Sequence, residues 1–239
     1  MLLTLITILK RSIIDFTALF FPSVCKKCYT ALNKKELYLC RRCLTSLPYS
    51  RYEQFYSNPV NKTFWGRTKI EFASSIFLFR QNETVQNLIY RLKYKNDPQC
   101  GIFLGEIAGH IYINSTIFKK ADIIIPVPLH PSKEKDRGYN QCAKIAQGIS
   151  KVTGIPVENN LLQRVAPAHS QTSKHKYDRW LNCEESFRVN NNNEIKDKKV
   201  LLIDDVITTG ATLEACCNKL NNLKNINLYI LTIAYTEIE

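Results

Sequence analysis

Strands that alternate with helices over residues 71–239 predict an α/β protein with a mostly parallel sheet, covered by helices on both faces. Four closely spaced cysteines near the N-terminus predict a small additional metal-binding domain. The composition agrees, because 45% hydrophobic and 23% charged residues are typical of globular proteins and exclude a disordered, collagenous or coiled-coil chain. We expect residues 1–48 to form an apolar helix and a finger, 49–70 a connector, and 71–239 the α/β domain.

Hydrophobic periodicity gives the elements of the α/β domain in order. Residues 72–79 are rich in β-forming side chains, and 83–93 place Val85, Leu88, Ile89 and Leu92 on one helical face. The charged residues 133–136 are expected in a solvated turn. The remaining strands are expected at 122–127, 156–157, 200–203 and 227–235. The remaining helices are expected near 101–111, at 140–153, and after the strand at 200–203 as far as residue 222.

The first 21 residues are apolar but are interrupted by Lys10-Arg11-Ser12. A spanning helix needs about 20 consecutive apolar residues, so no transmembrane segment is expected. A secretory signal would carry its positive charge ahead of the apolar run, and no charge precedes it here. We expect a helix that packs on the rest of the protein, with peripheral contact with a membrane surface as the alternative.

The chain is basic, with a net charge of +12, and half of that excess lies within residues 1–50. Such charge favours polyanions, although it also serves solubility. Aromatic residues follow directly in the connector, including Phe55, Tyr56 and Trp65. Basic residues interleaved with aromatic ones are typical of surfaces that bind single-stranded nucleic acid.

The cysteines Cys25 and Cys28, and then Cys40 and Cys43, form two C-x-x-C pairs separated by eleven residues. Each pair can present two thiolates to one tetrahedral cation, which predicts a structural zinc site. A redox pair and an iron–sulfur site are the alternatives. The other five cysteines follow no ligand spacing and are interpreted as small apolar residues in a reducing compartment, which favours a cytoplasmic protein.

The most informative segment is residues 200–213, in which an apolar strand leads to Asp204 and Asp205, then to a Thr/Gly loop, then to a helix. Ligands of parallel sheets bind at the carboxyl ends of strands. A loop with Gly210 at a helix N-terminus can direct several N–H groups at one anion. Carboxylates accept hydrogen bonds from hydroxyl groups while the loop donates to a phosphate. A sugar phosphate satisfies both.

This segment resembles the phosphoribosyl pyrophosphate (PRPP) signature of type I phosphoribosyltransferases. The resemblance implies that Asp204 and Asp205 meet the ribose hydroxyls. It also implies a loop that binds the 5′-phosphate, formed by Thr208, Thr209, Gly210, Ala211 and Thr212.

The whole chain is similar to the ComF-type family of phosphoribosyltransferase relatives, which is linked to bacterial DNA uptake. The similar features include Leu92-Lys93-Tyr94, Arg137-Gly138-Tyr139-Asn140-Gln141 and the four-cysteine finger. The resemblance implies a pyrophosphate loop whose backbone N–H groups meet the diphosphate, with Mg²⁺ bridging its oxygens, and a mobile loop that closes over PRPP. The pyrophosphate-side candidates are Pro126, Val127, Pro128, Leu129 and Arg137; the mobile-loop candidates are Arg164, Gln171 and Arg179.

Two functions follow from the resemblance and remain open at this point. The first is an Mg²⁺-dependent transferase that moves the phosphoribosyl group of PRPP to an unidentified acceptor. The second is a non-catalytic PRPP-binding accessory protein that binds single-stranded DNA or a DNA-uptake protein. No residue of the sequence is assigned as a general base.

Overall fold

The structure, a computed structural model, describes residues 22–79, 83–118, 120–165, 186–190, 195–223 and 225–237. The helix predicted for the first 21 residues, Gln171 and Arg179 lie outside the described residues. The chain divides into two compact units between Leu47 and Pro48.

In its described residues, 22–47, the first unit has a short loop structure followed by one helix. Val24 and Ala31 form an isolated antiparallel bridge, and helix α2 spans Arg41–Thr45. Few apolar side chains are buried in it besides two of the cysteines, chiefly Tyr38, Leu39 and Leu47. So small a core gives this unit little stability of its own.

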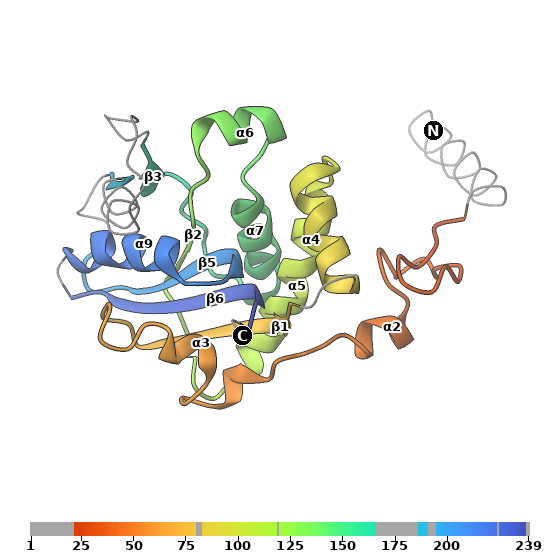
Figure 1. The fold of residues 1–239 in the computed structure, drawn as a ribbon, viewed down its shortest axis with the longest axis horizontal. Helices are drawn as coiled ribbons and strands as arrows, with labels where there is room; N and C mark the ends of the chain where they lie inside the picture. Colours follow the sequence, from red (N-terminus) through yellow and green to blue (C-terminus); the bar gives the residue numbers. More distant parts are fainter. Residues whose placement is uncertain are drawn as a thin grey trace, which may run out of the picture. The chain divides into compact units, whose positions relative to one another are not determined.

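The second unit is built on a four-stranded sheet in the order β1-β6-β5-β2, in which every neighbouring pair is parallel (Figure 1). This confirms the predicted parallel sheet. The bounds are β1 (Phe72–Leu78), β2 (Ile123–Pro126), β5 (Lys199–Ile207) and β6 (Asn227–Tyr235). The sequence placed the end of β5 too early, because Val206 and Ile207 continue the pairing with β6. Val157 forms a single bridge to Ile124 rather than a strand.

Helices cover both faces of this sheet, as predicted. On one face, α9 (Ala211–Asn221) and α3 (Pro59–Lys62) pack in one cluster with alternate strand residues such as Leu202 and Ile230. The intervening strand residues, such as Leu201 and Leu231, are equally buried. Side chains alternate across a strand, so the second set faces α5 (Pro98–Asn114) and α7 (Gln141–Thr153), which contact β6, β5 and β2.

Helices α5 and α7 approach each other closely through two glycines. A Cβ atom at Gly105 would lie 2.1 Å from the Ile145 carbonyl oxygen, and one at Gly148 would lie 2.1 Å from the Ile102 carbonyl oxygen. Because any side chain at either position would collide with backbone, glycine sets the distance between these helices.

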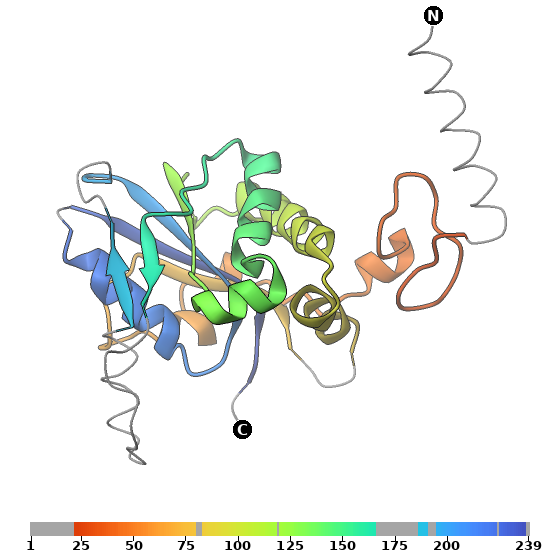
Figure 2. The ribbon, with the colours of Figure 1, turned by 90° about the horizontal axis from the view of Figure 1, so that it is seen from above.

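Shorter elements complete the unit. Helix α4 (Thr84–Tyr94) precedes α5, and the connector contributes a 3₁₀ turn, η1 (Tyr52–Gln54), as well as α3. Strands β3 (Leu162–Arg164) and β4 (Phe187–Val189) form a separate antiparallel ladder (Figure 2). The charged segment expected in a turn is instead helix α6 (Pro131–Arg137), whose first residue is a proline and whose side chains are mostly exposed. Among the described residues no helix has the length and hydropathy needed to cross a membrane.

Candidate functional sites

The four cysteines of the two C-x-x-C pairs come together in the first unit. The sulfur atoms of Cys25, Cys28, Cys40 and Cys43 all lie within 4.8 Å of one another, and Cys28 Sγ and Cys40 Sγ are 3.7 Å apart. A tetrahedral ion with zinc–sulfur bonds of about 2.3 Å requires sulfur–sulfur distances of about 3.8 Å. The arrangement therefore fits zinc, with all four ligand positions supplied by thiolates.

The surroundings of the cluster push its thiols toward different protonation states. The hydrogen bond with the Thr30 hydroxyl lowers the pKa of Cys28 to about 6, whereas burial raises the pKa of Cys43 to about 12. A thiol such as Cys43 becomes a thiolate only with a cation beside it, and a bound metal ion is such a cation. Glu36 fixes the loop between the pairs, because its carboxylate accepts from the backbone N–H groups of Asn33 and Arg41.

The two predicted acidic residues lie near the carboxyl end of β5 and are buried. Asp204 is 9% exposed and Asp205 is 4% exposed. Asp204 Oδ1 accepts hydrogen bonds from the Asp205 N–H at 2.8 Å and the Cys142 thiol at 3.3 Å. Lys93 Nζ lies 3.0 Å from Asp205 Oδ2. Burial, reinforced by the charge of Asp205, raises the pKa of Asp204 to about 7.

The predicted phosphate loop follows and leads directly into α9. Residues Thr208–Thr212, together with Asp204 and the ends of the flanking elements, line a cavity of about 50 Å³. Gly210 has a φ of +75° and stands at the N-cap position, where it offers no side chain to cap the helix. The N–H groups in the first turn of α9 are therefore not capped by a side chain at residue 210. They remain available to an anion at the N-terminus of the helix.

Arg67 in the connector braces this loop, and sequence reasoning missed it. Its Nη1 donates to the carbonyl oxygens of Thr63 at 3.0 Å and Thr209 at 2.9 Å, and its Nε donates to Glu214 Oε2 at 3.1 Å. Glu214 lies buried in the first turn of α9, where its charge would repel a bound phosphate. Arg67 neutralises that charge and holds the loop against α3.

The segment Pro126–Leu129 ends β2 beside β5, at the same edge of the sheet as the acidic pair. The Val127 N–H donates to the Ile203 carbonyl oxygen at 2.8 Å, and the Val127 carbonyl accepts from the Asn140 amide at 3.0 Å. Two of the four residues are prolines, which have no N–H. The expectation that several N–H groups of this segment meet a diphosphate therefore reduces to that of Leu129.

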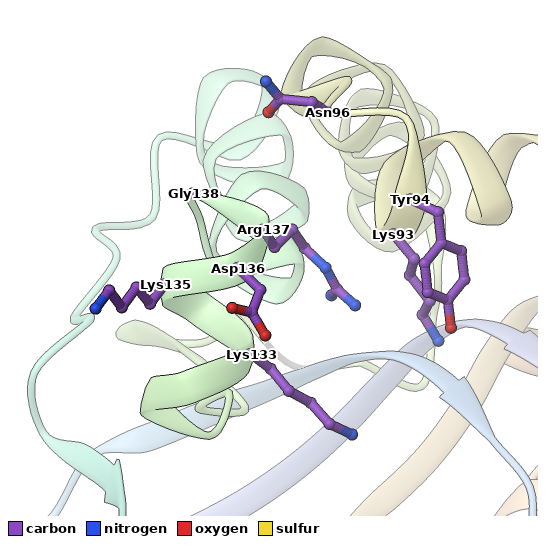
Figure 3. Close-up of a pocket in the computed structure, with 8 residues that line it drawn as sticks. All are labelled: Lys93, Tyr94, Asn96, Lys133, Lys135, Asp136, Arg137 and Gly138. Atoms are coloured by element: carbon purple, nitrogen blue, oxygen red, sulfur yellow. The ribbon is translucent and has the colours of Figure 1, made fainter.

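Arg137 lines a cationic pocket of about 570 Å³ between α6 and the end of α4. We call it the α4–α6 pocket. Figure 3 shows Arg137, Lys133 and Lys93 directed into the same space, whereas Lys135 points away from it. The Arg137 guanidinium is 5.9 Å from the ring centroid of Tyr94 and donates to the Gln141 side chain. The residues that line the pocket are Lys93, Tyr94, Asn96, Lys133, Lys135, Asp136, Arg137 and Gly138.

The two walls of this pocket are tied together. The Tyr139 hydroxyl donates to the Leu92 carbonyl oxygen at 2.5 Å, which joins the residue after Gly138 to the last turn of α4. Lys93 both lines the pocket and pairs with Asp205, so this one side chain connects the pocket with the acidic pair. Lys93 and Cys142 complete the surroundings of the carboxylates, and no local sequence pattern marked Cys142.

Arg164 lies away from the α4–α6 pocket. It is the last residue of β3, its guanidinium is 5.3 Å from the ring centroid of Phe187, and it lines a second pocket of about 600 Å³ together with Pro128 and Leu129. The pyrophosphate-side candidates are thus divided, with Arg137 in one pocket and Pro128 and Leu129 in the other.

Comparison with known proteins agrees with this arrangement. Residues 140–232 match the family model described as the phosphoribosyl transferase domain. Competence protein F of Haemophilus influenzae is 28% identical over 218 residues, which cover 85% of this chain and 93% of that protein. Competence protein ComFC of Bacillus subtilis is 26% identical over 201 residues, covering 80% and 74% respectively.

Two solved structures also resemble the chain. The glutamine PRPP amidotransferase of Bacillus subtilis has a TM-score of 0.42 and 16% identity, over 60% of this chain and 30% of that one. The adenine phosphoribosyltransferase of Leishmania tarentolae has a TM-score of 0.38 and 13% identity, over 80% and 94%.

The parallel sheet, the matched domain and the acidic strand end define a protein with the phosphoribosyltransferase fold. The four-cysteine cluster, and the similarity to competence proteins along most of the chain, support a ComF-type protein with this fold.

Proposed function

We propose that the chain binds PRPP and transfers its phosphoribosyl group to an acceptor, in association with competence and DNA uptake. The observation that supports this most is the linkage of three features: Asp204 lines the cavity of the phosphate loop, and its neighbour Asp205 pairs with Lys93, which lines the cationic α4–α6 pocket. They match the three parts of PRPP, which are a 5′-phosphate, ribose hydroxyls and a diphosphate. None of the eight described cysteines forms a disulfide, which accords with action in the cytoplasm.

In this proposal each part of the site has one task. The N–H groups of residues 208–212 and the start of α9 hold the 5′-phosphate. Asp204 and Asp205 accept hydrogen bonds from the ribose hydroxyls and lie near the positive charge that builds on the sugar as the bond at C1 breaks. Arg137 and Lys133 bind the departing diphosphate, for which an arginine fork is well suited.

We expect PRPP to arrive as its Mg²⁺ complex, in which the metal neutralises diphosphate oxygens. The group Cys142, Asp204 and Asp205 does not itself resemble a magnesium cage. Burial raises the pKa of Cys142, so its thiol stays protonated, and sulfur is a poor ligand for a hard cation. We therefore assign Mg²⁺ to the substrate complex and zinc to the finger.

The test of this proposal is PRPP binding by calorimetry and pyrophosphate release in the presence of Mg²⁺ and a panel of acceptor bases. The double variant Asp204→Asn plus Asp205→Asn should lose at least tenfold in affinity, because hydrogen bonds to charged groups are worth about 1.5–3 kcal/mol each. Asp122→Asn is the matched control, since Asp122 accepts the Lys199 N–H at the opposite end of the same strands. Equal PRPP affinity in the folded double variant and the wild type would refute the ribose assignment.

A second candidate function is that of an accessory protein that binds single-stranded DNA. Exposed aromatic side chains beside cations favour it. Trp65 is 60% exposed with the Lys62 ammonium 5.9 Å from its ring centroid, and Tyr29 of the finger is 76% exposed. Arg41 and Arg42 are exposed as well. Rings offer stacking faces for unpaired bases, while the cations contact phosphates.

Gel-shift titrations at two salt concentrations separate the two candidates. Under the second, single strands bind better than duplex, affinity falls steeply as salt rises, and Arg41→Gln plus Arg42→Gln weakens binding without changing PRPP affinity. Lys198→Gln plus Lys199→Gln removes the same charge from the second unit and is the control. Failure of single-stranded DNA to bind at low salt would exclude the accessory function.

A further inference from the structure

Lys93 occupies a place in the site that its sequence position does not explain. It is the next-to-last residue of α4, far along the chain from β5, yet its ammonium lies 3.0 Å from Asp205 Oδ2. The side chain of Lys93 is 24% exposed and that of Asp205 only 5%. Figure 3 shows the same lysine reaching into the α4–α6 pocket, so one cation serves both places.

The groups around the carboxylates make this contact consequential. Asp204 faces the charge of Asp205 on its own strand and the Cys142 thiol from α7, and Lys93 reaches the pair from α4. The Cys142 thiol is held neutral by burial. Within the part of the chain that the structure describes, Lys93 is therefore the positive group among those that face the pair, and two adjacent buried carboxylates are costly without a cation.

We propose that Lys93 is a positioning residue of the ribose site: its ammonium holds the Asp205 carboxylate in the ligand-free protein and moves from it toward the α4–α6 pocket when ribose hydroxyls take its place. The choice of ribose as the incoming group rests on the proposed function, whereas the hold on Asp205 does not. A lysine suits this exchange, because its ammonium is a compact charge on a flexible stem with three donors.

The exchange conserves favourable contacts for both partners. Asp205 gives up an ion pair and accepts hydroxyl donors. Lys93 gives up a carboxylate and gains diphosphate oxygens beside Arg137 and Lys133. Lys93 thus links occupation of the diphosphate pocket to release of the ribose site, and it keeps the acidic pair ready to accept hydrogen bonds before the ligand arrives.

If Lys93 acts on the carboxylates, the loss of PRPP affinity on its removal should depend on pH, whereas the loss of one charge from the pocket alone would lower the affinity equally at each pH. The Lys93 charge lowers the pKa of Asp204, so its removal shifts protonation of that carboxyl to higher pH. With a rise of about one pKa unit, the Lys93→Met variant should lose about tenfold in PRPP affinity relative to wild type at pH 6.5 and less than about threefold at pH 8.5. Taking the ratio to wild type cancels the titration of PRPP itself.

Lys95→Met is the matched control. It removes the same charge two residues further along the chain, at the C-cap of α4. There the Lys95 ammonium lies over the Tyr90 ring and not beside the carboxylates. Its loss of affinity should be equal at the two pH values. A loss in Lys93→Met that is equally independent of pH, or no loss at all, would overturn the proposal. Circular dichroism checks the fold, and Lys93→Gln replaces Lys93→Met if the latter is unfolded.

A second measurement needs no PRPP. In protein labelled with ¹³C at aspartate carboxyl carbons, the apparent pKa of Asp204 should rise in Lys93→Met, because a positive charge that lowers it has been removed. Unchanged values would overturn the proposal even if PRPP binds. Failure of wild type to bind PRPP, together with a shifted titration, would refute the proposed function and leave the ion pair supported.

Discussion

The finger and the α/β unit are stabilised in opposite ways. In the described finger, a handful of apolar side chains is buried, and the four thiols form a cluster that a bound metal ion would hold together. In the α/β unit, strands β5 and β6 are buried on both faces, and the acidic pair and the phosphate loop lie toward the carboxyl end of β5. We therefore expect the fold of the finger to depend on its metal ligands, whereas the fold of the α/β unit should depend less on its site residues than on its core.

The largest expected effect breaks the finger alone. Cys40→Ser should reduce the zinc content from about one ion per chain to almost none and unfold the finger, because structural zinc contributes roughly 10–16 kcal/mol to such domains. The α/β unit should keep its thermal transition. Elemental analysis and calorimetry measure both quantities.

Cys100→Ser is the control for that variant. Cys100 is buried in α5, where its thiol donates to the Leu88 carbonyl oxygen, and a serine hydroxyl can make the same bond. Its zinc content should equal that of wild type. Native protein without zinc, whose four finger thiols react freely with an alkylating reagent, would contradict the assignment.

The opposite experiment breaks the α/β unit and spares the finger. Gly148→Val places side-chain atoms against the Ile102 carbonyl, so α5 and α7 must separate. We expect a loss of at least about 3 kcal/mol, the upper part of the usual range for overpacking, with zinc retained. Urea unfolding followed by helix signal measures the loss.

Gly101→Ala tests whether the effect of Gly148 is one of backbone collision. Its Cβ would meet Lys144 Cβ at 2.8 Å and the end of the Leu92 side chain at 2.9 Å, which are milder contacts than the 2.1 Å between a Cβ at Gly148 and the Ile102 carbonyl oxygen. A loss in Gly101→Ala as large as that in Gly148→Val would show that the close helix approach is not decisive.

The dependence of folding stability on pH tests how strongly the buried carboxyl of Asp204 affects the stability of the α/β unit. The pKa of Asp204 is raised to about 7 in the folded state, against about 3.9 in unfolded chains, so the folded state binds the proton more tightly. Folding stability should therefore decrease as pH rises from about 4 to about 7 and level off above, by on the order of 1–4 kcal/mol. Asp204→Asn should remove this slope in denaturant titrations across pH, and an unchanged slope would contradict the shift.

The smallest expected effect concerns the brace of the phosphate loop. Arg67→Leu leaves the Glu214 carboxylate buried without its partner and frees the Thr209 carbonyl. Because Arg67 is 35% exposed, solvent screens the pair, and we expect a stability loss of only about 1–2 kcal/mol.

PRPP affinity of Arg67→Leu should fall more than stability suggests, because Glu214 then faces the bound phosphate. Adding Glu214→Gln should restore most of the affinity by removing that repulsion. Calorimetry of the single and double variants checks this, and a double variant as weak as Arg67→Leu would assign the effect to loop order alone.

The features that depend on local patterns could be predicted from the amino-acid sequence. The spacing of Cys25, Cys28, Cys40 and Cys43 indicated one metal cluster, and the run from Val200 to Leu213 indicated a strand, an acidic end and a loop into a helix. Hydrophobic periodicity located the final strand at 227–235, the bounds that β6 has. Such features can be predicted because neighbours along the chain share one backbone geometry.

The distant groups that complete the site could be identified only from the tertiary structure. Arg67 reaches Glu214 across 147 residues of sequence, and Tyr139 reaches Leu92 across 47. Lys93 and Cys142 approach the acidic pair from two different helices. The Val127 N–H, free in the sequence reading, is used by β5. These contacts depend on strand order and on how closely helices pack, and no local pattern records either quantity.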